Sequence, residues 1–267
     1  MSLRLRRGWR RFFWQRLTNP NRKTKPAFIV GCGRSGTSML IHRLGRSWAV
    51  DPFNEDNQAA FEKWRIRPLN VIENLIDRSY AQIALFKPVL TTPHSCEYLA
   101  RFPDARMFFV YRHYTDVINS SVKKFGPSDR LAHVDSWIND DFDEFAPIAP
   151  PETTAAMIRR LWKPYLSPES AAALYWLFYN SLYYDLGLAQ DSRVKLIGYE
   201  PLVNNAGQEI KEACEFLDLK FEPRMSADIF ATSVGRDDPP DMDPDIQSAC
   251  EALWQRLQAS LTEVVVN

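Results

Sequence analysis

The chain has 267 residues, of which 45% are hydrophobic and 25% are charged, values that are ordinary for a globular domain with a substantial core. No apolar run reaches the ~18 residues that a membrane-spanning helix needs, and no secretory leader is evident. The four cysteines are far apart and match neither a metal-ligand nor a Cys-x-x-Cys spacing. Composition therefore argues against a membrane-spanning or disulfide-rich protein. We expect a cytoplasmic protein with reduced cysteines and no metal site.

Positive charge is concentrated at the N-terminus, although the formal net charge is zero. Residues 1–50 contain 12 of the 33 Lys and Arg residues and no Asp or Glu. Within this part, residues 3–17 mix arginine with Trp, Phe and Leu, a pattern typical of basic amphipathic helices that lie on anionic membrane surfaces. The alternative is a helix that packs its aromatic side chains on the domain or on a second subunit. Contact with nucleic acid is not expected, because no recognition motif accompanies the charge.

A linker follows this basic segment. Residues 19–26 are rich in Asn, Lys and Pro, which favour irregular structure. We therefore divide the chain into a basic arm with its linker, residues 1–25, and one domain, residues 26–267. Peripheral contact with the inner face of a membrane is one role that we expect for the arm.

A strand, a glycine-rich turn and a helix are predicted over residues 28–44. The β-forming run ends at Gly31, and Leu40, Ile41 and Leu44 recur at helical spacing after the turn. Glycines in the turn let amide N–H groups converge on one point, at which the positive end of the helix is also directed. These features predict a phosphate site. Its candidate residues supply amide, guanidinium or hydroxyl donors and are Gly33, Arg34, Ser35, Gly36, Thr37 and Ser38.

Two common phosphate loops fit this turn only in part. The nucleoside-triphosphatase loop has a lysine directly after its last glycine, where this chain has Thr37. The dinucleotide fingerprint is matched by Gly31, Gly33 and Gly36, but it needs an acidic residue about 20 positions later, at the end of a second strand. Glu55 lies near that distance, yet the residues before it show no strand pattern.

Strands and helices alternate along the rest of the chain. After irregular residues 48–56, hydrophobic periodicity predicts helices at 62–67, 69–76 and 95–101, strands at 81–88, 106–111 and 193–198, and a final helix at 244–261. This alternation predicts an α/β fold with a doubly wound, mainly parallel sheet flanked by helices. Ligands in such sheets bind at the carboxyl ends of the strands.

Two further regions bear on a binding site. Residues 125–151 contain Gly, several Pro and many acidic residues, which predicts a long loop of the kind that covers a site. Residues 161–184 carry many aromatic side chains at helical spacing. Core packing is the preferred interpretation of these aromatics, and stacking on a sugar is the alternative.

Basic residues stand at the ends of two predicted strands. Lys87 lies near the end of the strand at 81–88, and Arg112 follows the strand at 106–111. Ser120 lies 8 residues after Arg112, and a guanidinium beside a hydroxyl is suited to binding a phosphate. The alternatives are a surface turn for Lys87 and an ion pair with Asp116 for Arg112.

The glycine turn, Gly31-Cys32-Gly33-Arg34-Ser35-Gly36-Thr37-Ser38, and the segment from Arg112 to Ser120 resemble the two signature motifs of sulfotransferases that use 3′-phosphoadenylyl sulfate (PAPS). The resemblance implies the P-loop-like sulfotransferase architecture, PAPS as cosubstrate, PAP as product and no metal. In this family the turn binds the 5′-phosphosulfate, which Arg34 and Lys87 would neutralise here. Arg112 and Ser120 would hold the 3′-phosphate.

Two weaker features extend the resemblance toward the C-terminus. The segment Tyr199-Glu200-Pro201-Leu202, after a predicted strand, is similar to one with which many sulfotransferases open a helix. We expect a structural role for this glutamate. A basic residue on a late loop can cap the 3′-phosphate in the family, and Arg236 is the candidate. An ion pair with the neighbouring aspartates is the alternative for Arg236.

The general base separates the branches of this family. The small-molecule branch has a histidine two residues after its strand-end lysine, where this chain has Val89, and a Trp after the loop, where it has Met39. The tyrosine-sulfating branch instead uses a glutamate at the position of Glu55, which lies 21 residues after Arg34. The resemblance therefore favours the glutamate-base or bacterial carbohydrate-type branch. The other candidates for the base are Asp56, Glu62 and His94.

We therefore expect an enzyme that transfers a sulfuryl group from PAPS to a hydroxyl acceptor by in-line displacement, with a carboxylate as the base. A carbohydrate or glycolipid is the preferred acceptor. Two alternatives belong to other classes. One is a P-loop nucleotide or small-molecule kinase, and the other is a catalytically inactive protein that binds PAP or a nucleotide and docks to a membrane.

Overall fold

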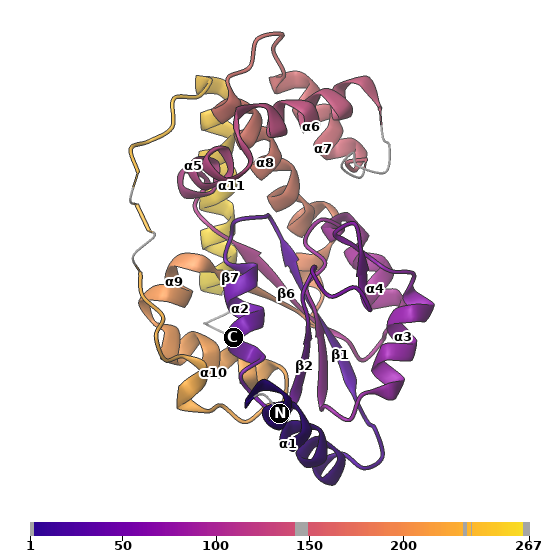
Figure 1. Cartoon of the computed structure of the whole chain (residues 1–267). Helices are drawn as coiled ribbons and strands as arrows, with labels where there is room; N and C mark the ends of the chain where they lie inside the picture. Colours follow the sequence, from indigo (N-terminus) through magenta and orange to yellow (C-terminus); the bar gives the residue numbers. More distant parts are fainter. Residues whose placement is uncertain (1–2, 142–148, 232–233, 236, 264–267) are drawn as a thin grey trace.

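The computed structural model describes residues 3–141, 149–231, 234–235 and 237–263. Within these residues a five-stranded sheet has the strand order β2-β5-β1-β6-β7, and every neighbouring pair is parallel. The strands are β1 (Lys25–Gly31), β2 (Val50–Phe53), β5 (Ile83–Phe86), β6 (Arg106–Tyr111) and β7 (Val194–Gly198). Helices lie on both faces of the sheet (Figure 1), so the predicted α/β fold with a mainly parallel sheet is confirmed.

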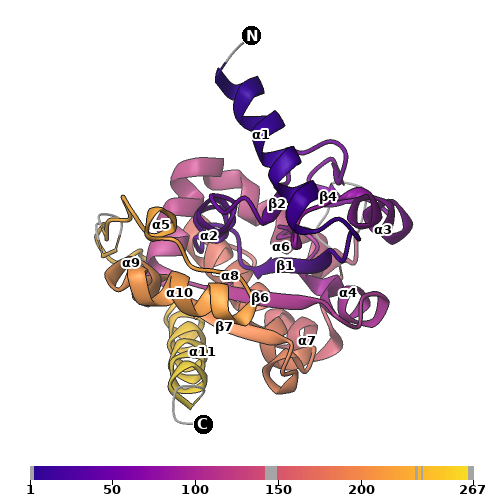
Figure 2. The same cartoon turned by 90° about the horizontal axis from the view of Figure 1, so that it is seen from below.

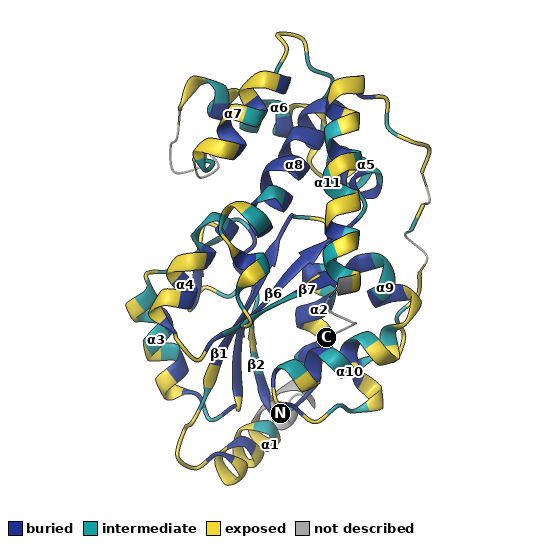
Figure 3. Ribbon diagram, turned by 180° about the vertical axis from the view of Figure 1, so that it is seen from behind, coloured by how far each residue is buried: buried dark blue, intermediate teal, exposed yellow. Residues whose placement is uncertain are grey.

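The central strands are continuous apolar runs because both of their faces are covered. Successive side chains of a strand point to opposite faces. Phe28 and Val30 of β1 therefore join one hydrophobic core, whereas Ala27 and Ile29 join the other. Figure 3 shows these strands as the buried centre of the molecule.

Two groups of helices cover the two faces. The core with Phe28 and Val30 is completed by α3 (Leu69–Arg78), α4 (Ser95–Arg101), α8 (Pro168–Asp185) and α11 (Pro244–Glu263). The other core is completed by α2 (Thr37–Leu44), α9 (Tyr199–Asn204) and α10 (Ala206–Phe216). Short 3₁₀ turns occur at η1 (Thr92–His94), η2 (Leu188–Gln190) and η3 (Pro223–Met225).

The helix α8 is the centre of a second, all-helical layer. It contacts α5 (Tyr114–Phe125), α6 (Pro127–Asn139), α7 (Glu152–Leu161) and α11. Its residues 170–180 are all buried, and the aromatic rings among them stack on one another and on neighbouring helices. The interpretation of residues 161–184 as core is therefore confirmed for most of this segment.

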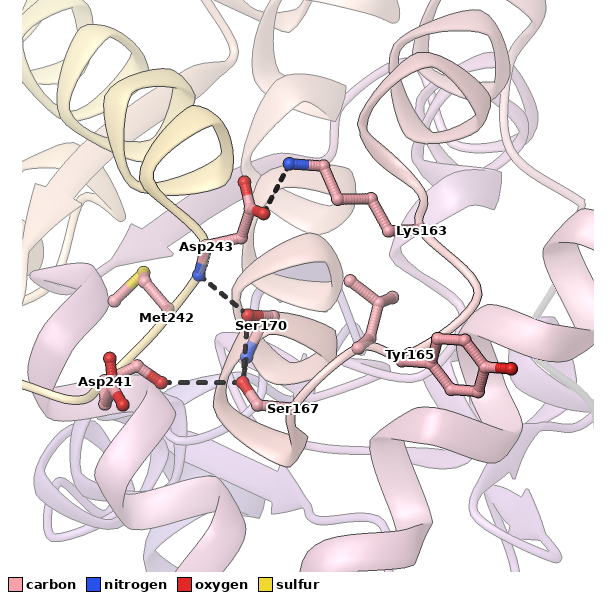
Figure 4. A pocket seen from close by; sticks show the side chains of 8 residues that line it. Lys163, Tyr165, Ser167, Ser170, Asp241, Met242 and Asp243 are labelled. Atoms are coloured by element: carbon pink, nitrogen blue, oxygen red, sulfur yellow. Dashed lines mark hydrogen bonds and ion pairs between the residues drawn. The ribbon is translucent and has the colours of Figure 1, made fainter.

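Polar contacts fix the first turn of α11 to the first turn of α8 around a hollow of about 280 Å³ (Figure 4). The backbone N–H of Asp243 donates to Ser170 Oγ at 2.9 Å, and the Lys163 ammonium donates to Asp243 Oδ2 at 2.5 Å. Ser167 caps α8 by accepting from the Ser170 N–H at 3.1 Å. These contacts anchor the C-terminal helix beside the buried one.

Two predictions for residues 48–67 are wrong. The segment expected to be irregular forms β2, whose Pro52 is tolerated because β2 is an edge strand. The helix expected at 62–67 is a short hairpin of β3 (Phe61–Glu62) and β4 (Arg65–Ile66). Its turn residues Lys63 and Trp64 have φ of 47° and 66°. Two-residue hairpin turns of this kind usually contain Asn-Gly, so the residues Lys-Trp did not indicate a hairpin in the sequence.

The loop predicted over residues 125–151 is also wrong in its first half, where α6 forms. Gly126 and Pro127 suggested irregular structure, but Pro is favoured at the first position of a helix, where it needs no hydrogen-bond partner. Residues 142–148 lie outside the described part of the chain. This helix matters for function, because it forms one wall of the cavity described in the next subsection.

At the N-terminus, α1 (Leu3–Thr18) forms the expected helix and leads through a short linker into β1. It lies at the opposite end of the molecule from α6 and α7 (Figure 1), and its first turns project away from the remaining chain (Figure 2). No helix in the described residues is both long and apolar enough to cross a membrane.

The cysteines are free and three of them are buried. Burial raises the pKa of the Cys32 thiol to about 12, so it is protonated and unreactive at neutral pH. In the part of the chain that the structure describes, no three His, Cys, Asp or Glu side chains are grouped so that they could hold a metal ion.

The turn after β1 requires a glycine at position 31, and this requirement can be tested. Its φ is 127°, and a Cβ atom there would lie 2.2 Å from the carbonyl oxygen of Val110 on β6. We expect Gly31→Ala to lower the free energy of unfolding by about 2–4 kcal/mol in urea titrations. Gly33→Ala is the matched control, because a Cβ atom at Gly33 would have no neighbour within 4 Å. A change of under about 1 kcal/mol is expected for this control. Equal effects of the two substitutions would contradict the close approach.

Candidate active site

A cavity of about 430 Å³ lies at the carboxyl ends of the strands, where parallel sheets bind their ligands. The glycine turn, the ends of β2 and β5, the β3–β4 hairpin and the helices α5, α6 and α8 contribute to it. Its lining residues are Gly33, Arg34, Thr37, Ser38, Glu55, Lys63, Trp64, Lys87, Val89, Leu90, Lys124, Phe125, Asp129, Arg130, His133 and Tyr175. The lining brings together six of the residues predicted for cosubstrate binding or catalysis, namely Gly33, Arg34, Thr37, Ser38, Glu55 and Lys87. The predicted residues Ser35, Gly36, Arg112 and Ser120 are not part of it.

The glycine turn is held from two sides. The hydroxyl of Thr92 accepts from the Gly31 N–H at 3.0 Å and lies 3.1 Å from the Gly31 carbonyl oxygen, to which it can donate. Gly36 has a φ of 92°, and a Cβ atom there would lie 2.4 Å from the ring of Tyr199. The backbone therefore turns sharply against an aromatic ring and enters α2 at Thr37. This arrangement presents the N-terminus of α2, a favourable place for an anion, to the cavity.

Arg34 joins the glycine turn to α5. Its guanidinium Nε donates to Ser120 Oγ at 3.0 Å. Burial, followed by the positive charges of Arg112 and Arg130, lowers the pKa of Arg34. The second effect indicates that three guanidinium groups share one region, although they come from the turn, β6 and α6. Such a concentration of positive charge favours a ligand with more than one negative group.

Arg112 sits at the end of β6, where only 7% of the residue is exposed. It forms an ion pair with Asp116 at 3.0 Å, as the alternative interpretation of this arginine anticipated. The centre of its guanidinium also lies 4.3 Å from the centroid of the Tyr199 ring, the same ring against which Gly36 packs. One aromatic side chain therefore contacts both predicted phosphate segments.

The late loop approaches this arginine through its carboxylate partner. The Gly235 N–H donates to both carboxylate oxygens of Asp116 at 3.2 Å. Arg236, the predicted cap for a 3′-phosphate, lies outside the described residues. Its neighbour Gly235 nevertheless reaches the helix that carries Ser120.

Glu200 has a structural position. It accepts a hydrogen bond from the His113 N–H at 2.9 Å and thereby ties the start of α9 to the segment after β6. Burial raises the pKa of Glu200, and burial also lowers the pKa of His113. Glu200 is absent from the lining of the cavity, which agrees with the structural role expected for it.

Glu55 and Lys87 form a buried ion pair between the ends of β2 and β5. Their side chains are 15% and 5% exposed, so the interpretation of Lys87 as a surface-turn residue is wrong. The Leu90 N–H lies 3.4 Å from Glu55 Oε1 and helps to orient the carboxylate. Both members of the pair line the cavity, because β2 and β5 are adjacent parallel strands that end at the same level.

The other predicted candidates for a base do not reach the cavity. Asp56 is exposed, Glu62 lies 3.7 Å from Arg67, and His94 lies 2.7 Å from Glu97. Of the four acidic or histidine residues considered, Glu55 is therefore the one that lines the cavity.

The wall of the cavity that α6 forms was not expected from the sequence. Arg130 is 6% exposed, donates to Ser121 Oγ at 2.9 Å, pairs with Asp129 at 3.0 Å and lies 3.7 Å from the centroid of the Tyr175 ring. His133 lines the cavity one turn later, and burial lowers the pKa of its imidazole, which keeps it neutral at pH 7. The available signal was the spacing of Arg130 and His133 on one helical face, which the supposed loop concealed.

The β3–β4 turn was missed as well. Lys63 and Trp64 line the cavity, and both have positive φ although neither is glycine. Residues held in this region of backbone space occur often at functional sites, because the surrounding structure must stabilise them. Phe125, at the end of α5, adds a second aromatic ring that is 45% exposed.

The structure also corrects the reason for rejecting a dinucleotide site. A strand, β2, does precede Glu55, contrary to expectation. However, β5 lies between β2 and β1, whereas the dinucleotide fold places its second strand directly beside the first. The Glu55 carboxylate is moreover paired with Lys87. A ribose-binding role for Glu55 is therefore excluded by the strand order and by this ion pair.

Solved sulfotransferase structures share the fold. A sulfotransferase from Alicyclobacillus acidocaldarius is 17% identical, with a TM-score of 0.50 over 91% of this chain and 96% of its own. The sulfotransferase domain of the Synechococcus PCC 7002 olefin synthase is 16% identical, with a TM-score of 0.53 over 88% and 97%. The sulfotransferase domain from the curacin biosynthetic pathway is 15% identical, with a TM-score of 0.52 over 86% and 98%. At these identities the likeness shows the fold alone. No curated protein matches the chain.

The sequence itself matches a known family over most of its length. The sulfotransferase domain family aligns with residues 24–234, a range that includes the glycine turn, both ends of the Glu55–Lys87 pair, Arg112 and Ser120. The resemblance seen in the two motifs is confirmed at the level of the family. The chain belongs to the sulfotransferase family.

Proposed function

We propose that this sulfotransferase takes its sulfuryl group from PAPS and transfers it to a carbohydrate hydroxyl, with Glu55 as the general base. Membership of the family establishes sulfuryl transfer in general and implies a hydroxyl-bearing acceptor. The cosubstrate, the base and the acceptor class are proposals, and each has its own support in the described residues.

The hydrogen bond from Arg34 to Ser120 is the observation that carries the PAPS proposal. PAPS bears a 5′-phosphosulfate and a 3′-phosphate on one adenosine, so its two anionic ends need neighbouring sites. The glycine turn, residues 33–38, offers amides, hydroxyls and the α2 N-terminus to the 5′ end. Arg112 and Ser120 would bind the 3′-phosphate, with Arg236 as a further candidate beside Gly235. The direct contact between turn and α5 makes these two sites contiguous.

Transfer would proceed in line, as in phosphoryl transfer. The acceptor oxygen attacks sulfur, the bond between sulfur and the bridging oxygen breaks, and PAP leaves with the electron pair of that bond. Arg34 and Lys87 stabilise the negative charge that builds on the leaving phosphate. Glu55 accepts the proton of the acceptor hydroxyl. Its fixed position beside Lys87 and the Leu90 N–H supports this role, because a base must be oriented to act.

The walls of the cavity support an acidic carbohydrate as the acceptor. Trp64 and Phe125, which are 62% and 45% exposed, offer aromatic faces on which a sugar ring can stack. The described lining also carries five basic side chains against two carboxylates. Arg34 and Lys87 are assigned to PAPS, and this leaves Lys63, Lys124 and Arg130 on the acceptor side with Asp129. A net positive acceptor side favours a sugar that itself bears a carboxylate or sulfate.

Two rivals remain distinguishable by experiment. A kinase is disfavoured because the first residue of α2, where the phosphate-binding lysine would stand, is Thr37. A catalytically inactive PAP-binding protein would have the same two phosphate sites but would show no turnover.

The cosubstrate proposal predicts a selective thermal shift. PAP should raise the melting temperature strongly, whereas ATP and NAD should not, because only PAP occupies both phosphate sites. Arg112→Met and Ser120→Ala should each weaken PAP binding about tenfold or more in calorimetric titrations. Arg101→Met is the matched control, since Arg101 pairs with Glu73 at the surface. Equal stabilisation by ATP, with magnesium-dependent hydrolysis, would support the kinase instead.

The proposed base predicts a loss of turnover without a loss of binding. Glu55→Gln should reduce kcat by about 10²–10⁴-fold and leave the affinity for PAP within a few-fold. Glu62→Gln, an exposed glutamate on the β3–β4 hairpin, should remain near wild type. Turnover is followed as transfer of labelled sulfate from PAPS. A Glu55→Gln enzyme with wild-type kcat, together with an inactive His133→Asn enzyme, would move the role to His133.

If the acceptor is an acidic sugar, the enzyme should prefer negatively charged sugars to neutral ones. Among pairs of otherwise identical sugars, the acidic member should have a kcat/KM about tenfold or more above the neutral one. Lys124→Gln should reduce this preference, mainly through KM. Lys123→Gln is the control, because Lys123 is also exposed but lies outside the cavity lining. Equal rates with both members of each pair would rule out recognition of an acidic sugar.

A further inference from the structure

The N-terminal helix α1 is attached to the domain by its polar side. Gln15 is 4% exposed, and its side-chain amide donates to the Trp48 carbonyl oxygen at 2.9 Å and to Asp51 Oδ1 at 2.8 Å. Arg11, one turn earlier, lies 3.5 Å from the same carboxylate. Ser79 completes this network by donating to Asp51 Oδ2 at 2.6 Å. Hydrogen bonds and one ion pair therefore attach this face of the helix to the domain.

The opposite side of α1 is apolar and exposed. Trp9, Phe13 and Leu17 follow one another at four-residue spacing and therefore lie along one face. They are 56%, 55% and 82% exposed. Phe12 and Trp14, on the flanks of α1, do pack on the domain, because their rings lie 5.7 Å from the ring of Tyr80 and 6.1 Å from that of Trp48. The row of Trp9, Phe13 and Leu17 remains exposed, whereas an ordinary surface helix buries such an apolar stripe. Figure 2 shows the first turns of the helix extending beyond the domain.

Charge indicates which partner covers this row. The sequence of α1 contains six arginines and no acidic residue. Arg10 and Arg16 are exposed, and they lie on either side of the row formed by Trp9, Phe13 and Leu17. Aromatic and leucine side chains between arginines match the interface of an anionic bilayer, where rings enter the boundary of the acyl chains and guanidinium groups meet the headgroups.

A second copy of the chain fits this face less well. Pairing two such helices would bring twelve arginines of the same charge together, twice the six of one helix. A row of three apolar side chains is also small compared with the roughly 800 Å² per partner of a stable protein interface. Nucleic acid would meet the positive charge but would leave the apolar row unsatisfied. The lipid surface accounts for both features.

We propose that α1 is an interfacial anchor that docks this sulfotransferase on an anionic lipid surface, with Trp9, Phe13 and Leu17 inserted and Arg10 and Arg16 at the headgroups. The inference is independent of the proposed cosubstrate and acceptor, because α1 contributes no residue to the cavity.

Vesicle sedimentation tests the anchor. The full chain should bind vesicles of phosphatidylcholine and phosphatidylglycerol, and bind pure phosphatidylcholine far more weakly. Phe13→Ser and Leu17→Ser should each weaken binding about tenfold, as expected for loss of one inserted side chain. Tyr165→Ser is the matched control, because Tyr165 is 98% exposed and lies between α7 and α8, at the opposite end of the molecule from α1 (Figure 1). This control should bind as the wild type does.

Further measurements separate the possible partners. Arg10→Glu and added salt should both weaken vesicle binding, because part of the attraction is electrostatic. The melting temperatures of Phe13→Ser and Leu17→Ser, followed by circular dichroism without any ligand, should equal that of the wild type, which shows that the variants are folded. The proposal fails if neutral and anionic vesicles bind the chain equally or not at all. It also fails if these variants instead abolish a dimer in solution or binding to duplex DNA.

Discussion

The packing of the glycine turn against β6 and α9 is the constraint on which the site depends. Gly31 lies so close to Val110 that no side chain fits there, and Gly36 lies equally close to Tyr199. The same tyrosine ring lies beside the guanidinium of Arg112. One aromatic side chain therefore fixes the distance between the turn and the arginine after β6. The hydrogen bond from Arg34 to Ser120 then closes the arrangement.

The strand order explains how chemistry is added beside this anion site. Because β5 separates β2 from β1, Glu55, the second residue after β2, lies beside Lys87, the first residue after β5. This order creates the Glu55–Lys87 pair at the floor of the cavity. A carboxylate and an ammonium thus stand at the position where, in our proposal, the acceptor hydroxyl meets the sulfuryl group.

The proposed catalytic site and the proposed lipid anchor lie at different ends of the molecule. The cavity is walled by α6, whereas α1 lies at the opposite end of the chain (Figure 1). A protein held on a lipid surface through α1 would therefore keep α6 and its wall of the cavity at the end remote from that surface.

The sequence by itself determined the elements whose signals are local. The apolar runs of β1, β5, β6 and β7, the glycine turn and the helical periodicity of α8 follow from steric and hydrophobic rules that act within a few residues. The motifs around Arg34 and Arg112 accordingly predicted the family, which the comparison confirmed.

Tertiary structure decided what depends on neighbours distant in sequence. The strand nature of Val50–Phe53 comes from pairing with β5, and the hairpin turn at Lys63 and Trp64 has residues that local propensity does not favour there. Only folding places Arg130 and His133 of α6 in the cavity and turns the apolar row of α1 outward. The reason is physical: a side chain's burial and partners are set by packing between segments, and a single sequence carries no direct record of that packing.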